Sequence, residues 1–301
     1  MAAEVLDALK PKPGGHYADG TVGGAGHAAS ILDASSPIGW LFGCDRDGAA
    51  VEAAQQRLSE KFAGRFEIRR GNFAEMTEWI PLGSCDGVIL DLGVSSPQLD
   101  FAERGFSFQN DGPLDMRMDD RQSLTASDLV NGLGAEKLAK IFWELGGERD
   151  SRKLAKAIVH DRVQRKFETT RQLAELIERI LPRHGKKTHP ATRVFQALRI
   201  AVNDEIGSLK RGLEAALKIL KPHGRLAVIT FHSLEDRTVK EWGREKTRPY
   251  TFSGEVDVPE LREPWAPAMK WVWRKAILPG ETELNENPRS RSAQLRVLEK
   301  V

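Results

Sequence analysis

The first hundred residues alternate between short apolar runs and longer stretches with an apolar residue every three or four positions. The short runs predict four buried strands: Tyr17–Thr21, Trp40–Asp45, Phe66–Gly71 and Asp86–Leu92. The longer stretches predict helices over Ala25–Ala34 and Asp47–Phe62. Strands that alternate with helices predict a parallel sheet that is covered on both faces.

The alternation stops in the middle of the chain. Between Phe106 and Arg199 no convincing strand pattern occurs, and helical periodicity predicts helices over Ala135–Trp143, Arg152–Arg165 and Thr170–Leu181. The alternation then resumes with a predicted helix over Glu205–Leu220, a stop signal at Lys221–Gly224 and a strand over Arg225–His232. Two late runs, Met269–Ile277 and Ser292–Glu299, predict an antiparallel pair that closes the sheet.

These patterns predict an α/β protein with a Rossmann-like, mostly parallel sheet, an antiparallel C-terminal strand and an inserted helical domain. We expect residues 1–106 and 200–301 to form the sheet domain and residues 107–199 to form the insertion. With 301 residues the chain is long enough to bury a sizeable core.

Composition is that of a soluble protein, with 40% apolar and 29% charged residues. No apolar run approaches the roughly 20 residues that span a bilayer, and the first residues lack the basic start and apolar core of a secretory signal. The only two cysteines, Cys44 and Cys85, cannot form a disulfide framework. We therefore expect a cytoplasmic protein without a membrane partner.

Positive charge is concentrated in the insertion. From Arg149 to Arg199 there are 14 Lys and Arg residues against 5 Asp and Glu residues, although the whole chain carries a net charge of only +2. Clustered cations favour a polyanionic partner such as a nucleic acid. Solvated helix faces would give the same composition, so charge alone leaves both interpretations open.

A glycine-rich loop follows the first predicted strand, where open α/β sheets bind ligands. Two cofactors suit such a loop. The residues Gly24–Ala29 match the G-x-G-x-x-A pattern of dinucleotide sites, and Asp45 follows about 20 residues later. This motif is weak, because segments rich in glycine and alanine produce it by chance.

S-adenosylmethionine is the second cofactor that suits the loop. Asp19 at the end of the first strand suits its cationic end, and Asp45 at the end of the second suits its ribose hydroxyls. Phe73 after the third strand is placed to stack on adenine. A dinucleotide gives Asp19 and Phe73 no role, so we favour the methyl donor, although each residue alone could be a turn or core residue.

Polar residues around a proline follow the fourth strand, where a methyl acceptor would approach. Asp91 and Ser95 are candidates to orient an exocyclic amine, and Gln98 could contact either the cofactor or the base. Methylation of a cytosine carbon would require a thiolate beside the base. Neither Cys44 nor Cys85 belongs to this loop, so that chemistry is disfavoured.

Two further clusters contain chemically useful side chains. His232 follows the last parallel strand and borders the same edge, and Glu235 and Asp236 follow it. Because no second His or Cys cluster completes a ligand shell, we predict an acidic helix start and no metal. A basic loop and helix start carry Lys186, Lys187, His189 and Arg193, which could hold phosphate or could simply be exposed.

Longer motifs make the chain resemble one family. The segments DGTVGGAGH, LDLGVSSPQLD, DGPLDMRMD, HPATRVFQALRI, FHSLEDR and NPRSRSA occur in the order typical of the RsmH (MraW) methyltransferases. The resemblance runs from about Glu4 to about Glu299 and implies transfer of a methyl group from S-adenosylmethionine to N4 of a cytidine in the decoding region of 16S ribosomal RNA.

The resemblance also implies roles for particular residues and partners. Its cofactor contacts fall on Ala25, Gly26, His27, Asp45, Phe73, Asp91 and Gln98. The substrate would be small-subunit ribosomal RNA in an assembled subunit or late precursor, and the helical insertion would help to recognise it. A homodimer is possible. The alternatives are an amino-methyltransferase acting on another RNA or on a protein, and a nicotinamide-dependent oxidoreductase.

The chain departs from the family pattern in two places. Its Ala25 stands where the family has glycine, so a positive φ at this position would be strained. Relatives usually carry a His-x-Pro-Val lead before the equivalent of Glu4, which is missing here. Either a substrate contact made by that lead is missing, or the start of the chain is misassigned.

Overall fold

The computed structural model describes residues 1–183, 189–252 and 257–301. The chain divides into two compact units. The first unit combines Met1–Gly93 with Ile206–Val301, and the second comprises Val94–Glu205. The predicted insertion, residues 107–199, lies inside the second unit, which extends beyond it at both ends.

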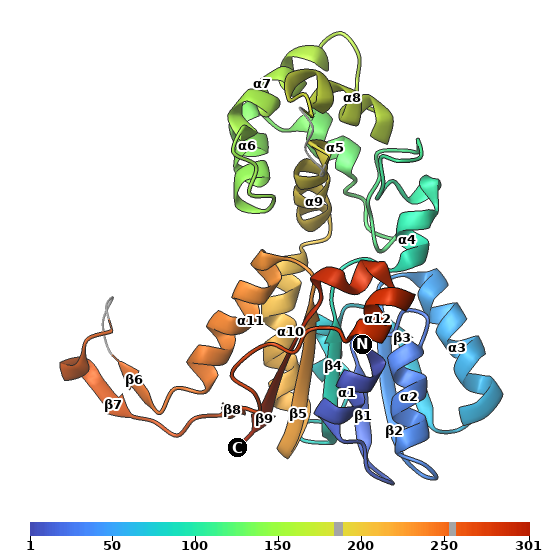
Figure 1. Cartoon of the computed structure of the whole chain (residues 1–301), viewed down its shortest axis with the longest axis vertical. Helices are drawn as coiled ribbons and strands as arrows, with labels where there is room; N and C mark the ends of the chain where they lie inside the picture. Colours follow the sequence, from blue (N-terminus) through green and yellow to red (C-terminus); the bar gives the residue numbers. More distant parts are fainter. Residues whose placement is uncertain (184–188, 253–256) are drawn as a thin grey trace. The chain divides into compact units, whose positions relative to one another are not determined.

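A seven-stranded sheet forms the centre of the first unit (Figure 1). Its strands are β1 (His16–Asp19), β2 (Trp40–Asp45), β3 (Phe66–Arg70), β4 (Cys85–Asp91), β5 (Leu220–Thr230), β8 (Met269–Trp271) and β9 (Gln294–Lys300). They lie in the order β3-β2-β1-β4-β5-β9-β8. The first five are parallel, and β9 runs antiparallel to both β5 and β8. The predicted sheet with an antiparallel C-terminal strand is therefore confirmed.

Strand β5 starts earlier than its sequence pattern indicates. It begins at Leu220, so Lys221–Gly224 lie within the strand and do not separate it from the preceding helix. Pairing with β4 is irregular there, because the register shifts between Cys85 and Gly87. The preceding helix ends at Ile219, so the helix stop predicted at these residues is confirmed. Only the start of the strand differs from the prediction, because Leu220 already pairs with Cys85.

Helices cover both faces of the sheet. They are α1 (Ala2–Leu9), α2 (Gly26–Ala34), α3 (Gly48–Phe62), α10 (Glu205–Ile219) and α11 (Ser233–Lys246). A further short helix, α12 (Glu281–Glu286), has no buried residue. In β4, Ile89 packs into the core under α1, α2 and α3, whereas Val88 and Leu90 pack into the core under α10 and α11. This alternation along one strand places its carboxyl end at the rim between two packed layers. A two-stranded ribbon, β6 (Tyr250–Phe252) and β7 (Arg262–Pro264), completes the unit.

The second unit is helical. It contains α4 (Ser96–Asp100), α5 (Ala126–Gly132), α6 (Ala135–Glu144), α7 (Ser151–Asp161), α8 (Thr170–Ile180) and α9 (Ala191–Val202). Its core includes Phe142, Leu154, Ile177 and Leu198, all fully buried. Among the described residues of this unit no strand forms, and the three helices predicted there correspond to α6, α7 and α8. No helix in the described part of the chain is both long enough and apolar enough to cross a bilayer.

Candidate functional site

Three acidic residues end neighbouring strands of the sheet. Asp19, Asp45 and Asp91 are the last residues of β1, β2 and β4, and β1 lies between the other two strands. Parallel strands bring their carboxyl ends to one edge, so the three carboxyl groups belong to the same rim of the first unit. The sequence predicted these residues at strand ends, and the strand order makes them neighbours.

The loop from Gly20 to Ala25 joins β1 to α2 at this rim. A Cβ atom added to Gly24 or Gly26 would meet no atom within 4 Å, so packing inside the chain does not require glycine there. Open space beside glycine backbone is what a closely approaching ligand needs. Ala25 has φ 59° and ψ 29°, the left-handed conformation that was expected to strain an alanine.

Asp45 ties this loop to the second strand. Its Oδ2 accepts a hydrogen bond from the Gly23 N–H at 3.0 Å, and its Oδ1 accepts one from the Asp47 N–H at 3.0 Å. Burial raises the pKa of Asp45, while these two backbone donors act in the opposite direction. Each carboxylate oxygen has a second lone pair, so the group can accept further hydrogen bonds.

Asp19 is buried, with 2% of its surface exposed. Its Oδ1 accepts a hydrogen bond from the Thr21 N–H at 3.0 Å. Burial is the main cause that raises the pKa of Asp19 to about 6, against the opposing attraction of His27. Thr21 in turn accepts a hydrogen bond at its Oγ1 from the Asp91 N–H at 2.7 Å, which links the ends of β1 and β4. Sequence reasoning missed Thr21, although an Asp two residues before a loop Thr is a known turn pattern.

His27, in the first turn of α2, points toward the end of β4. Its Nε2 lies 3.4 Å from Asp91 Oδ2. Burial lowers the pKa of His27, but Asp91 and then Asp19 act against burial, and the net shift is upward. His27 Nδ1 and Asp91 Oδ1 are buried atoms without a hydrogen-bond partner among the described residues. Buried polar atoms are rarely left unpaired, so both atoms mark places where a ligand's polar groups would fit.

Phe73 lies at the start of a short 3-10 helix after β3 and is partly buried. Its ring packs beside Gly20 and against Gly212 of α10, where an added Cβ would overlap the ring. Asn72 donates to Ser208 Oγ at 3.0 Å, and Arg46 donates to the same oxygen. The ring is therefore held between the glycine loop and α10, and its proposed contact with adenine stays a prediction.

Ser95 and Gln98 belong to the second unit and cap helix α4. Ser95 Oγ accepts from the Gln98 N–H at 3.4 Å, and Gln98 Oε1 accepts from the Ser95 N–H at 3.0 Å. This reciprocal pair is a capping box, which the S-x-x-Q spacing signals in the sequence. This capping role was not predicted from the sequence, and the roles of Ser95 and Gln98 in catalysis remain predictions.

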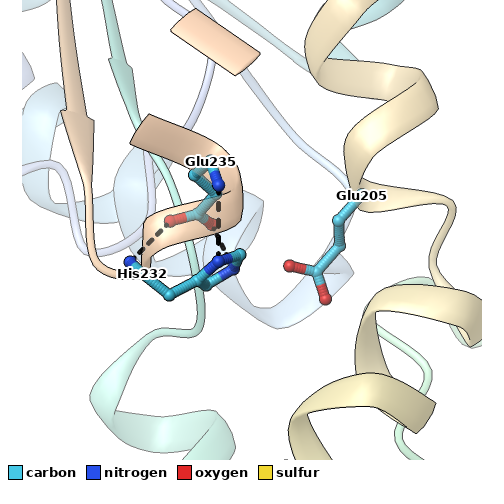
Figure 2. Close-up of side chains that lie close together, drawn as sticks. All are labelled: Glu205, His232 and Glu235. Carbon is cyan, nitrogen blue, oxygen red and sulfur yellow. Dashed lines mark hydrogen bonds and ion pairs between the residues drawn. The ribbon is translucent and has the colours of Figure 1, made fainter. Parts of the chain in front are cut away.

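His232 caps α11 in the same reciprocal way (Figure 2). Its Nδ1 accepts from the Glu235 N–H at 3.4 Å, and Glu235 Oε2 accepts from the N–H groups of Phe231 and His232. His232 Nε2 is buried and lies 3.1 Å from Glu235 Oε1, without forming a hydrogen bond. The helix start predicted for FHSLEDR is confirmed. Figure 2 also draws Glu205, which pairs with Arg199 at 2.8 Å in the second unit.

The four residues predicted to hold phosphate differ in their structural environment. Lys186 and Lys187 lie outside the described residues. His189 is turned inward with 13% of its side chain exposed, because its Nδ1 accepts from the Ala191 N–H at the start of α9 and its ring packs on Phe108. Burial lowers its pKa. Arg193 is exposed on α9 and remains a candidate for contact with RNA.

Comparison with known proteins gives consistent matches along the entire chain. The model of the MraW methylase family matches residues 1–301. A protein of Geobacter sulfurreducens called "Ribosomal RNA small subunit methyltransferase H" is 51% identical over 306 aligned residues, covering 100% of this chain and 97% of that protein. Proteins of the same name from Syntrophotalea carbinolica and Geobacter sp. are 48% and 51% identical, covering 100% and 99% of this chain and 96% of each relative.

Proposed function

The chain belongs to the MraW methylase family, and from that premise we propose that it is an S-adenosylmethionine-dependent methyltransferase acting on N4 of a cytidine in 16S ribosomal RNA. The observation that carries the proposal is the rim formed by Asp19, His27 and Asp91, beside a glycine loop with open space. Two buried atoms in this rim lack hydrogen bonds, and their chemistry suits the methionine end of the donor.

The rim offers an acceptor for the ammonium group and a donor for the carboxylate group at the methionine end of the cofactor. Asp91 Oδ1 is an acceptor suited to an ammonium group, and His27 Nδ1 is suited to a carboxylate when it carries a proton. Asp19 is buried nearby and would favour a cationic sulfonium through its charge. The backbone of Ala25 and Gly26 lies at the start of α2, where N–H groups attract anionic oxygens.

Two further residues suit the nucleoside end. Asp45 keeps a lone pair on each oxygen beyond its bonds to Gly23 and Asp47, so it can accept from ribose hydroxyls. Phe73 lies beside Gly20, and its ring would provide an apolar surface for adenine. Asn72 and Arg46 both donate a hydrogen bond to Ser208, and these bonds attach the ends of β3 and β2 to α10.

When bound, S-adenosylmethionine supplies an electrophilic methyl group on a sulfonium. The residues after β4 then have the task of positioning the acceptor amine for in-line attack. We assign this task to Asp91, Ser95 and Gln98, whose oxygens can accept amine hydrogens and leave the nitrogen lone pair directed at the methyl carbon. The released proton can pass to water after transfer, so no general base is assigned. The base must leave any stack to be reached.

A dinucleotide suits this rim less well. Its pyrophosphate would approach the same loop, close to the two carboxylates of Asp19 and Asp91. Like charges in a buried setting repel more strongly than in water. A cationic donor gains from the same two groups, which is why we favour it over a nicotinamide cofactor.

The identity of the RNA rests on the relatives and on charge. The curated relatives carry small-subunit ribosomal RNA in their name, and the segment from Arg149 to Arg199 carries 14 Lys and Arg residues against 5 Asp and Glu residues. We propose a target in the decoding region of an assembled subunit or late precursor, in the cytoplasm, with Arg193 and His232 on the RNA side. We also propose that Lys186 and Lys187, which lie outside the described residues, contact the RNA, and that the protein can form a homodimer.

Calorimetry and mass spectrometry test the two halves of the proposal. We expect the chain to bind S-adenosylhomocysteine and not NAD, and Asp45→Ala to weaken that binding by about tenfold or more through loss of a charged acceptor. Asp47→Ala is the matched control, because Asp47 caps α3 through the Ala49 N–H and has no assigned ligand contact. Binding of NAD alone would end the proposal. Small subunits from cells lacking the protein, treated with it and the donor, should gain one methyl group on a 16S cytidine, located by mass spectrometry.

A further inference from the structure

A groove on the second unit is lined by none of the described residues assigned above. It has a volume of about 830 Å³ and is bounded by the facing sides of α6 and α7 and the turn between them. The two helices pack directly against each other within the unit (Figure 1). The side chains that give it chemical character are Lys140, Trp143, Arg149, Arg152, Lys153 and Lys156.

Trp143 is the unusual member of this set. Its side chain is 58% exposed, whereas its neighbour Phe142 is fully buried in the core. Glu136, Lys140 and Trp143 are spaced at four and then three residues, which puts them on the face of α6 that lines the groove. A single exposed Trp is ordinary on a protein surface. Here it lies in a concave surface lined by cations, which is the combination found at sites for single-stranded nucleic acids.

The cations of the groove are mostly uncommitted. Five basic side chains line it against two acidic ones, Glu136 and Asp150. Within the described part of the chain, Arg149, Arg152 and Lys156 form no ion pair or side-chain hydrogen bond. Lys153 donates to the Ile180 carbonyl at 3.3 Å, and Lys140 lies 3.9 Å from Glu144. A stripe of unpaired cations beside an exposed aromatic ring is complementary to a phosphodiester backbone with unstacked bases.

Close packing connects the groove to α9. A Cβ added to Gly146, in the turn between α6 and α7, would overlap the backbone carbonyl of Arg193. Glycine is thus required for the turn to reach α9, and the exposed Arg193 side chain starts from backbone that touches the turn. A strand of RNA in the groove would therefore pass near a residue already proposed to contact RNA.

We propose that the groove between α6 and α7 binds a single-stranded segment of the RNA substrate, with one base stacked on Trp143 and phosphates paired with Arg149, Arg152 and Lys156. This inference rests on the proposed function, which makes RNA the substrate, and it adds a second contact on the helical unit. Stacking tolerates every base, so the groove contributes affinity and orientation rather than sequence choice. The base in the groove is not the base that is methylated.

Fluorescence anisotropy with a labelled oligouridylate of about 12 nucleotides tests the groove on the full chain. Trp143→Ala should weaken binding about tenfold, and Trp143→Phe should recover most of the loss because it keeps a stacking ring. Trp265→Ala is the matched control, since Trp265 is 65% exposed on the other unit. Binding by Trp143→Ala within twofold of the unaltered chain would overturn the proposal.

Charge reversal gives an independent measurement. The double change Arg152→Glu and Lys156→Glu should weaken binding and reduce the slope of log affinity against log salt by about 0.7 for each lost phosphate contact. Lys137→Glu is the control, because Lys137 is exposed on α6 but does not line the groove. An unchanged slope in the double variant would refute the phosphate contacts.

Cross-linking covers the case in which a variant fails to fold. The unaltered chain, irradiated with a 4-thiouridine oligonucleotide, should yield cross-linked peptides from α6 or α7, and cross-links confined to other segments would overturn the inference. The proposed function fails in a different way. Loss of S-adenosylhomocysteine binding, or absence of cytidine methylation by a chain that binds RNA normally in the groove, would remove the proposed function and leave the groove standing.

Discussion

His27 Nε2 and Asp91 Oδ2 lie 3.4 Å apart, and each side chain has a second buried polar atom without a hydrogen bond. His27 lies in the first turn of α2 and Asp91 at the end of β4, so the two side chains meet at the rim of the sheet. Asp91 raises the pKa of His27 against the effect of burial. The pair is therefore poised to present a proton and a charge to a ligand.

Asp91→Asn should lower the pKa of His27, because the largest contribution that keeps its imidazole protonated is removed. A histidine whose pKa is raised on folding stabilises the protein below its unfolded pKa of 6.5, and this contribution is lost as pH rises through the folded pKa. The stability difference between the two proteins should thus shrink at alkaline pH. NMR titration of the His27 ring measures this change in pKa, and the His27 resonance is assigned by its absence in His27→Gln. An unchanged His27 pKa in Asp91→Asn would contradict the effect of Asp91. Donor affinity should fall about tenfold or more.

Asp19→Asn should stabilise the protein and weaken donor binding together. Because folding raises the pKa of Asp19 from 3.8 to about 6, the folded state binds more protons than the unfolded state in that range, and stability falls as pH rises through it. The amide removes this cost and can still accept from the Thr21 N–H. We expect a gain of about 1–3 kcal/mol at pH 7 that vanishes below about pH 4. Urea unfolding across this range checks it, and a variant less stable at pH 7 would show that the carboxylate is not strained by burial.

Ala25→Gly should leave the free energy of unfolding almost unchanged, whereas Ala28→Gly should lower it. Ala25 and Ala28 are both fully buried, but only Ala25 has a positive φ. Glycine at Ala25 relieves about 1 kcal/mol of backbone strain, which offsets the loss of a buried methyl group. Glycine at Ala28 has no such relief and should cost about 1.5–2 kcal/mol in the free energy of unfolding. Equal losses in denaturant titrations of the two variants would mean that Ala25 is not strained.

Ser95→Gly separates a structural role of Ser95 from a catalytic one. Glycine is tolerated at helix N-caps at a cost of a few tenths of a kcal/mol, so α4 should persist. If the hydroxyl orients the acceptor amine, the rate of methyl transfer should fall about tenfold with little change in stability. Thr125→Gly is the control, because Thr125 heads the equivalent capping box of α5 and has no proposed catalytic role. Full activity in Ser95→Gly would leave Ser95 as a cap only.

Much of the candidate site could be predicted because its signals are local. Asp19, Asp45 and Asp91 follow apolar runs that read as strands, and strand ends in a parallel sheet share one edge. The strain at Ala25 followed from comparing one alanine with a glycine expected in the family motif. The capping boxes of Ser95 and His232 were also readable from spacing, although they were interpreted first as chemistry.

The sequence by itself determined the class of fold, the rim on which ligand-binding residues lie and the basic segment from Arg149 to Arg199, because hydrophobic period, caps and composition act over a few residues. Only the tertiary structure decided that β1 lies between β2 and β4, that Thr21 bonds to Asp91 and that Phe73 packs on Gly212. It also decided that Trp143 is left exposed between α6 and α7. These contacts join residues far apart in the chain, and they depend on how whole layers pack, which no local pattern encodes.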